Sequence, residues 1–164
     1  AMFASLAPMM EGLRVESLFG AEGKNVVVTG GGQGIGLMIA AGFVANGAHV
    51  IICSRGADKC KKAADGLTAL GPGTCTWFAA DLAGEAGCLA LAAHVRKAFP
   101  AVHVLVNNSG TAWGEPMESY PDKAWDKLFA LNVKAIFTVT RALLPELDRG
   151  SAPGAPARVI NIGS

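Results

Sequence analysis

A glycine-rich segment near the N-terminus has the composition of a phosphate-binding turn. Residues 29–36 (TGGGQGIG) directly follow an apolar β-branched run and directly precede a stretch with helical periodicity. Glycines in such a turn let backbone N–H groups and the amino end of the next helix approach a pyrophosphate. Three adjacent glycines could also form only a flexible turn, but the strand-to-helix context favours a dinucleotide. The residues expected to contact it are Gly30, Gly32, Gln33, Gly34 and Ile35.

The end of the next apolar run indicates which dinucleotide binds. A carboxylate about 20 residues beyond the glycines would hold the ribose 2′-hydroxyl of NAD. The chain instead has Cys53, Ser54 and Arg55 there, and its next carboxylate is Asp58. A guanidinium binds phosphate through two parallel hydrogen bonds, so Ser54 and Arg55 favour NADP, held by its 2′-phosphate. The alternative is that Arg55 is an ordinary solvated side chain.

These residues need a scaffold, and the chain alternates apolar runs with helical stretches. Continuous apolar runs are typical of strands buried on both faces, and they occupy residues 25–29, 48–53, 74–79, 102–107 and 158–162. Helical spacing occupies residues 34–46, 57–70, 84–99 and 121–147. Ser119 is the expected cap of the last helix, with Pro121 in its first turn. The pattern predicts an α/β fold, a Rossmann-type doubly wound parallel sheet with strand order 3-2-1-4-5.

The predicted domain is incomplete. Residues 1–23 form an N-terminal tail, and residues 24–164 form one NADP-binding domain. A doubly wound sheet ordinarily continues to six or more strands, whereas this sequence stops just after the fifth apolar run. We therefore expect the last strands and one more helix to lie beyond residue 164.

The composition excludes several classes of function. Hydrophobic residues make up 51% of the 164 residues and charged residues only 16%, which excludes intrinsic disorder. A net charge of +1 gives no electrostatic footprint for nucleic acid. The apolar stretches are interrupted before the ~18 residues of a spanning helix, so no membrane span is expected. The four cysteines lack metal-ligand spacing, which predicts no metal site, buried free thiols, and a cytoplasmic location or the matrix of a reducing organelle.

The order of these motifs resembles the short-chain dehydrogenase/reductase superfamily. The T-G-x-x-x-G-x-G spacing of residues 29–36 is typical of that family, and Asp-Leu after the third run resembles the pair that borders the adenine ring. Residues 107–110 (NNSG) resemble the family's N-N-A-G, with Ser in place of Ala. The cofactor-binding residues that the resemblance adds are Asp81, Leu82, Asn108, Ser109 and Gly110.

The resemblance also implies catalytic residues. In the family, hydride passes between nicotinamide and a carbonyl carbon, Ser holds the carbonyl oxygen, Tyr supplies the proton beside a Lys, and Asn anchors a water chain. Asn132 and Ser164 fall on the Asn and Ser positions. The Tyr-x-x-x-Lys motif is absent, because the one tyrosine, Tyr120, precedes Asn132 and has Ala124 four residues on. Tyr120 is therefore expected to be a packing residue.

A narrower resemblance concerns the substrate. Residues 109–114 (SGTAWG), 118–121 (ESYP) and 156–164 (PARVINIGS) resemble the branch of NADPH-dependent β-ketoacyl reductases associated with rhamnolipid biosynthesis. This implies that the parent protein reduces a ketone, a 3-oxoacyl thioester either small or linked to an acyl carrier, and that this chain is its cofactor-binding part. The alternatives are a non-catalytic nucleotide-binding or scaffold protein and an inactive fragment of the reductase. The apolar fourth helix implies a homo-oligomer, and a separate chain could supply the C-terminal half.

Overall fold

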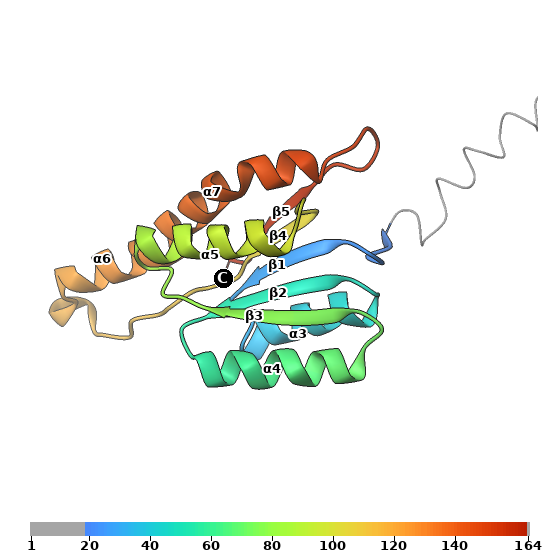
Figure 1. The fold of residues 1–164 in the computed structure, drawn as a ribbon. Helices are drawn as coiled ribbons and strands as arrows, with labels where there is room; N and C mark the ends of the chain where they lie inside the picture. The colour runs from blue at the N-terminus through green and yellow to red at the C-terminus, as the bar shows by residue number, and fades with distance from the viewer. Residues whose placement is uncertain (1–18, 164) are drawn as a thin grey trace, which may run out of the picture.

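Parallel strands with helices on both faces make up the computed structural model, which describes residues 19–163 (Figure 1). The predicted tail up to residue 18 and Ser164 lie outside the described residues. The elements in chain order are β1 (Asn25–Thr29), α3 (Gly34–Ala45), β2 (His49–Ser54), α4 (Ala57–Leu70), β3 (Thr74–Ala79), α5 (Glu85–Ala98), β4 (Val104–Asn107), the 3-10 turn η1 (Met117–Ser119), α6 (Asp122–Phe129), the π-helical segment η2 (Ala130–Lys134), α7 (Ala135–Arg149) and β5 (Arg158–Asn161).

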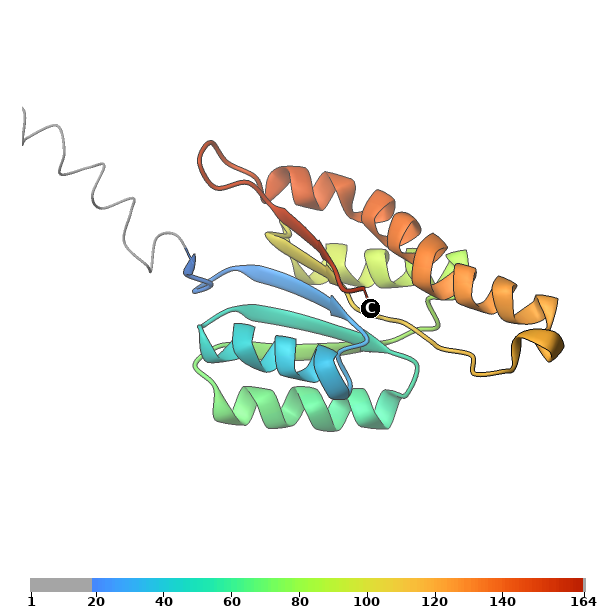
Figure 2. The same ribbon diagram turned by 180° about the vertical axis from the view of Figure 1, so that it is seen from behind.

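The five strands form one parallel sheet in the order β3-β2-β1-β4-β5, which confirms the predicted topology. Helices α3 and α4 cover one face, and α5 and α7 cover the other (Figures 1 and 2). Side chains of β1 alternate between the two layers: Val27 packs under α5 and α7, whereas Val26 and Val28 pack under α3 and α4. All three valines are fully buried, and each contributes roughly 1.5–3 kcal/mol of transfer free energy.

The predicted helix 121–147 has a more complex start than the sequence indicated. Ser119 does not cap it, because its one hydroxyl hydrogen is directed back to Glu115 Oε1 and the Pro116 carbonyl, which precede η1. Pro121 is the cap residue and lies in extended backbone rather than in the first turn. The residue before a proline is restricted to extended conformations, so Tyr120 separates Ser119 from the helix start. The helix then runs through α6, η2 and α7 to Arg149.

Four cysteines are free and buried, as their spacing predicted. Each lies inside one of the two layers or under the glycine-rich turn, and Cys53, Cys75 and Cys88 contact mainly apolar neighbours. Burial raises the pKa of Cys53 and of Cys75 to about 12. These thiols are therefore packing residues and not nucleophiles at neutral pH.

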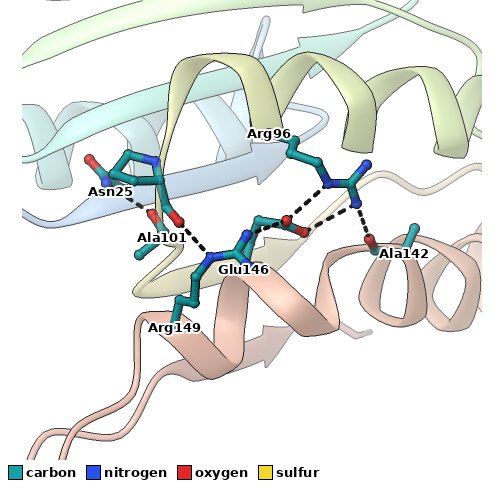
Figure 3. A network of polar contacts seen from close by, with 7 residues as sticks. Asn25, Arg96, Ala101, Ala142, Glu146 and Arg149 are labelled. Atoms are coloured by element: carbon teal, nitrogen blue, oxygen red, sulfur yellow. Dashed lines mark hydrogen bonds and ion pairs between the residues drawn. The ribbon is translucent and has the colours of Figure 1, made fainter.

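A buried carboxylate joins α5, α7 and the segment that leads into β4 (Figure 3). Glu146 is 1% exposed and accepts hydrogen bonds from Arg96 Nε at 2.9 Å and from Arg149 Nη2 at 2.6 Å. Arg149 Nε also donates to the carbonyl of Pro100. Burial alone would raise the pKa of Glu146, but the hydrogen bonds from the two arginines outweigh it and lower that pKa. The ion pair between Arg96 of α5 and Glu146 of α7 thus fixes α7 on α5.

The continuous helix 122–149 keeps a wide apolar surface. By length and composition alone it could cross a membrane, which the sequence had not led us to expect. One such helix is weak evidence for a span, and here α7 packs on α5 and contains the buried carboxylate of Glu146. The large apolar side chains exposed along it are Trp125, Phe129, Val133, Phe137 and Leu144.

Candidate cofactor-binding and catalytic site

A cavity of about 460 Å³ lies where the strands end, between the loops that follow β1, β2, β3 and β4. Carboxyl ends of parallel strands meet at one edge of the sheet, which is where ligands bind in open α/β sheets. Every residue that the sequence predicted to bind the cofactor lines this cavity. The structure adds walls that the prediction missed, namely Gly36, Gly56, Lys59, Ala80 and Leu131.

The glycine-rich turn after β1 is shaped by close backbone approach. Gly30 and Gly34 have φ of +70° and +56°, a left-handed backbone conformation that residues other than glycine rarely adopt. A Cβ on Gly36 would overlap the carbonyl oxygen of Gly30 and the side-chain amide of Asn108. A Cβ on Gly32 would lie 2.8 Å from the Ser54 hydroxyl oxygen. Side chains at these positions would fill the concave turn, so the glycines leave open the space that a pyrophosphate needs.

The loops after β1 and β4 are held together by Thr29 and Asn108. The Thr29 hydroxyl oxygen accepts the backbone N–H groups of Asn108 at 2.9 Å and of Ser109 at 3.0 Å. In return, the Asn108 side-chain amide donates to the Thr29 carbonyl at 3.0 Å. This reciprocal pairing fixes the NNSG turn against the glycine-rich turn and sets the width of the cavity between them.

The end of β2 supplies a polar and basic corner of the cavity. Ser54 Oγ lies 2.9 Å from Cys60 Sγ, which places the hydroxyl under the glycine-rich turn. Arg55 is exposed beside it, and Lys59 lies one helical turn further on, with its Nζ donating to Gln33 Oε1 at 3.3 Å. Sequence reasoning missed Lys59, because the contact of its side chain with Gln33 depends on how α4 packs beside the glycine-rich turn. Among the described residues that form the wall, the one acidic side chain is Asp81.

Asn132 lies in the π-helical segment η2, beside the loop that follows the NNSG turn. Its Oδ1 accepts the Thr111 backbone N–H at 2.8 Å, and its Nδ2 donates to the Thr111 carbonyl at 2.9 Å. Both side-chain groups are therefore engaged. One N–H of Nδ2 and one acceptor site of Oδ1 stay available to a water, and π segments within helices are frequent at functional sites.

The other predicted catalytic residue, Ser164, lies outside the described residues. The structure does describe β5 and residues 162–163, which precede it in the chain. Asn107 is the buried last residue of β4, and its Nδ2 donates to Asn161 Oδ1 at 2.9 Å and to Thr140 Oγ1 at 3.2 Å. The Ile162 backbone N–H also donates to the Asn107 carbonyl. The end of β5 is thereby tied to β4 and to α7.

Aromatic residues near the site have packing roles. Tyr120 is half-buried and forms an edge contact with Trp125, with 5.9 Å between ring centroids, which confirms the packing role expected for it. Trp113 is half-buried beneath two lysines, with Lys127 Nζ 4.9 Å and Lys123 Nζ 5.8 Å from the ring centroid. Within residues 19–163, no cluster of three or more His, Cys, Asp or Glu side chains could hold a metal ion.

The family model for short chain dehydrogenase matches residues 24–164. The chain belongs to the short-chain dehydrogenase family. A Pseudomonas aeruginosa protein, "Rhamnolipids biosynthesis 3-oxoacyl-[acyl-carrier-protein] reductase", is 45% identical over 146 residues, which cover 89% of this chain and 56% of that protein. The NADP-dependent (R)-specific alcohol dehydrogenase of Lentilactobacillus kefiri is 36% identical over 143 residues, with coverage of 87% and 55%. This short-chain dehydrogenase spans about half the length of the curated relatives it matches.

Solved structures of short-chain dehydrogenases confirm the Rossmann-type fold. The Pseudomonas aeruginosa RhlG/NADP active-site complex matches with a TM-score of 0.84 at 45% identity, and the match covers 87% of this chain and 55% of that one. L-Sorbose reductase from Gluconobacter frateurii, complexed with NADPH and L-sorbose, matches with a TM-score of 0.80 at 32% identity, with coverage of 85% and 52%. Both relatives were solved with an NADP-type dinucleotide.

Proposed function

We propose that this chain is the NADP-binding part of a short-chain reductase that transfers hydride to a ketone. The observation that carries the proposal is the glycine-rich turn combined with a basic corner at the end of β2, where NAD-binding domains have a carboxylate. The relatives named above are NADP-dependent or were solved with NADP or NADPH, which supports the same cofactor here.

The residues present fit such a dinucleotide along the whole cavity. The glycine-rich turn would hold the pyrophosphate, Ser54 and Arg55 the 2′-phosphate, and Asp81 with Leu82 the adenine ring. The NNSG turn would border the nicotinamide side. When bound, NADPH supplies the hydride for reduction of the carbonyl carbon.

We assign the remaining steps to Ser164 and Asn132. The developing negative charge on a carbonyl oxygen needs a hydrogen-bond donor, a role that fits Ser164. Asn132 would hold a water that delivers protons to the site. The loop from Ser109 onward, clamped to η2 through Thr111, would form one wall of the substrate site and exclude bulk water.

The proposed substrate class is a 3-oxoacyl thioester, small or linked to an acyl carrier protein. It is supported by the 45% identity to a 3-oxoacyl-[acyl-carrier-protein] reductase. Relatives that act on other carbonyls, such as L-sorbose reductase, share the scaffold, so substrate must be measured directly. The experiment follows NADPH oxidation with a 3-oxoacyl thioester and with L-sorbose, and determines the intact mass of the same sample. Turnover with the thioester supports the proposal, and turnover with the sugar alone overturns the substrate class.

A second candidate function is that of a nucleotide-binding protein without catalysis. The observation behind it is that Tyr120, the tyrosine among the described residues, packs edge-on against Trp125 and does not line the cavity. A single species of 16.8 kDa that binds NADPH but does not oxidise it would support this reading. A larger species or a second chain in an active sample would instead locate the catalytic half.

We also propose a homo-oligomer whose contact face is the exposed apolar stripe of α6, η2 and α7. Its central members, Phe129, Val133 and Phe137, are 53–62% exposed and recur every four residues, so they lie on one side of the helix. Exposed apolar patches of this kind mark interaction sites. A cytoplasmic location, expected from the cysteines, stays a prediction.

A further inference from the structure

Two positive charges occupy one corner of the cavity. Arg55 precedes α4, Lys59 lies in its first turn, and both line the cavity wall. The ion pairs found among residues 19–163 involve neither of them. The acidic wall residue, Asp81, accepts the backbone N–H of Ala83 at 3.1 Å. A corner with two such cations is suited to a multiply charged anion.

The position of Lys59 differs from that of an ordinary surface lysine. Its side chain runs along Gly56, where an added Cβ would lie 3.8–4.0 Å from three of its methylene carbons. Its Nζ then reaches across the corner to Gln33 Oε1, at the start of α3. The ammonium group therefore lies between α4 and the glycine-rich turn, in a cavity wall that also includes Ser54 and Arg55.

The other lysines of α4 provide an internal comparison. Lys61 Nζ pairs with Asp65 at 2.6 Å on the outer side of the helix. Lys62 is exposed and lines no part of the cavity. Of these three lysines, only Lys59 reaches the glycine-rich turn.

We infer that Lys59 is a second ligand of the NADP 2′-phosphate, and that Gln33 holds its ammonium in place until the phosphate arrives. The inference rests on the proposed function and deepens it, because cofactor preference would then depend on two cations. Their geometries are complementary. The planar guanidinium of Arg55 can bind two phosphate oxygens, whereas the Lys59 ammonium acts as a point charge on a third. The neutral amide oxygen of Gln33 is the weaker acceptor, so the phosphate replaces it.

The test compares Lys59→Met with Lys62→Met in the full chain. Each variant is titrated with NADPH and NADH, and with 2′,5′-ADP and 5′-AMP as probes of the phosphate corner alone. Lys59→Met is expected to weaken NADPH and 2′,5′-ADP binding roughly tenfold and to leave NADH and 5′-AMP unchanged. Lys62→Met is expected to change none of the four. Lys59→Arg, which keeps the charge, is expected to retain the NADPH preference, and thermal melts establish that each variant is folded.

A second measurement tests the role of Gln33. Gln33→Glu would give Lys59 an ion-pair partner and place a negative charge beside the phosphate, so NADPH binding is expected to weaken. In the Lys59→Met background the ion pair cannot form, so the cost of Gln33→Glu is expected to differ from its cost in the wild type. Equal costs in the two backgrounds would overturn the role of Gln33.

The outcomes distinguish the inference from the proposed function. If Lys59→Met and Lys62→Met bind NADPH equally well while the wild type still prefers NADPH over NADH, the role of Lys59 is overturned and the proposed function stands. If the wild type binds NADH as tightly as NADPH, the NADP assignment itself fails.

Discussion

The side chain of Asn132 forms two hydrogen bonds with the backbone of Thr111. Its Oδ1 accepts the Thr111 N–H at 2.8 Å, and its Nδ2 donates to the Thr111 carbonyl at 2.9 Å. This pairing joins η2 to the loop that follows the NNSG turn. The side chain of Asn132 therefore clamps the proposed substrate loop to the helix.

The first prediction concerns this clamp. Asn132→Asp has the same shape but places a carboxylate oxygen against the Thr111 carbonyl, so the loop should detach. We expect a loss of about 1 kcal/mol in the free energy of unfolding, because the site is exposed, together with a fall in turnover of the full-length reductase of at least roughly tenfold. Asn46→Asp is the control, since it breaks an exposed Asn46–Gly42 bond at the far end of α3. Equal turnover in the two variants would contradict the clamp.

The second prediction concerns cofactor preference. Arg55→Asp removes the guanidinium from the basic corner and adds a carboxylate that can accept from a ribose 2′-hydroxyl. NADPH affinity should fall roughly 10- to 100-fold relative to NADH, measured by fluorescence titration. Lys62→Asp makes the same charge change on the outer side of α4 and should leave the ratio alone. An unchanged ratio in Arg55→Asp would mean that Arg55 is an ordinary solvated side chain.

The third prediction uses two glycines of α3. Gly36→Ala would drive a methyl group into the Gly30 carbonyl and the Asn108 amide, so it should destabilise the fold and abolish NADPH binding. Gly42→Ala meets nothing within 4 Å and should raise stability by about 0.5–1 kcal/mol, because alanine is the better helix former. Thermal melts with and without NADPH check both. Similar melting temperatures for the two variants would refute the close-approach argument.

The fourth prediction is a pH dependence. The pKa of Glu146 is lowered in the folded protein, so its stabilisation is fully present above the unfolded value of about 4.3 and is lost as pH falls through the folded value. Glu146→Gln should therefore lower the free energy of unfolding by about 2 kcal/mol at neutral pH, with a smaller difference from wild type as the solution becomes acidic. Urea unfolding at several pH values measures this.

The control for that experiment is Glu85→Gln. Glu85 pairs with Arg141 at 2.7 Å, but both side chains are about half exposed, so water screens the pair. We expect its loss to cost less than about 1 kcal/mol at any pH. A difference between Glu146→Gln and wild type that stayed constant down to acidic pH would show that the Glu146 contribution is not electrostatic.

The fifth prediction addresses assembly. Phe137→Glu places a charge in the middle of the apolar stripe and should shift the protein toward monomer in sedimentation experiments at micromolar concentration. Leu70→Glu is the matched control, because Leu70 is 88% exposed at the end of α4, away from the stripe. A wild-type protein that is already monomeric at that concentration would remove the basis for the interface.

Local patterns in the sequence were enough to predict the strands and their order, but not every side-chain contact at the edge of the sheet where the cavity lies. Continuous valine and isoleucine runs identified β1 and β2, and the glycine spacing placed the cavity, because both depend on neighbours within a few residues. Lys59 was missed because its role depends on a side chain reaching from α4 to Gln33, 26 residues away in sequence. The failure of Ser119 as a cap came from the proline two residues on.

The Glu146 network lay beyond any sequence argument for a different reason. A glutamate in an apolar helix is ordinarily placed in water, and only the packing of α7 on α5 buries it between Arg96 and Arg149. The π segment at Asn132 was equally hidden, because residues 121–147 have a periodicity that predicts one regular helix.

The buried cysteines can be used to measure local unfolding, because their thiols are protected in the folded protein. Burial raises the pKa of Cys53 and of Cys75 to about 12 and both side chains are buried, so neither thiol is reactive at pH 8 in the folded protein. A thiol-specific dye can therefore react only when the surrounding layer opens, so the labelling rate at each cysteine measures how often that layer opens. The labelling rate of Cys60, which lies beneath the glycine-rich turn, would measure how often the cofactor site opens. The labelling rate of Cys88 would measure how often α5 opens on the opposite face of the sheet.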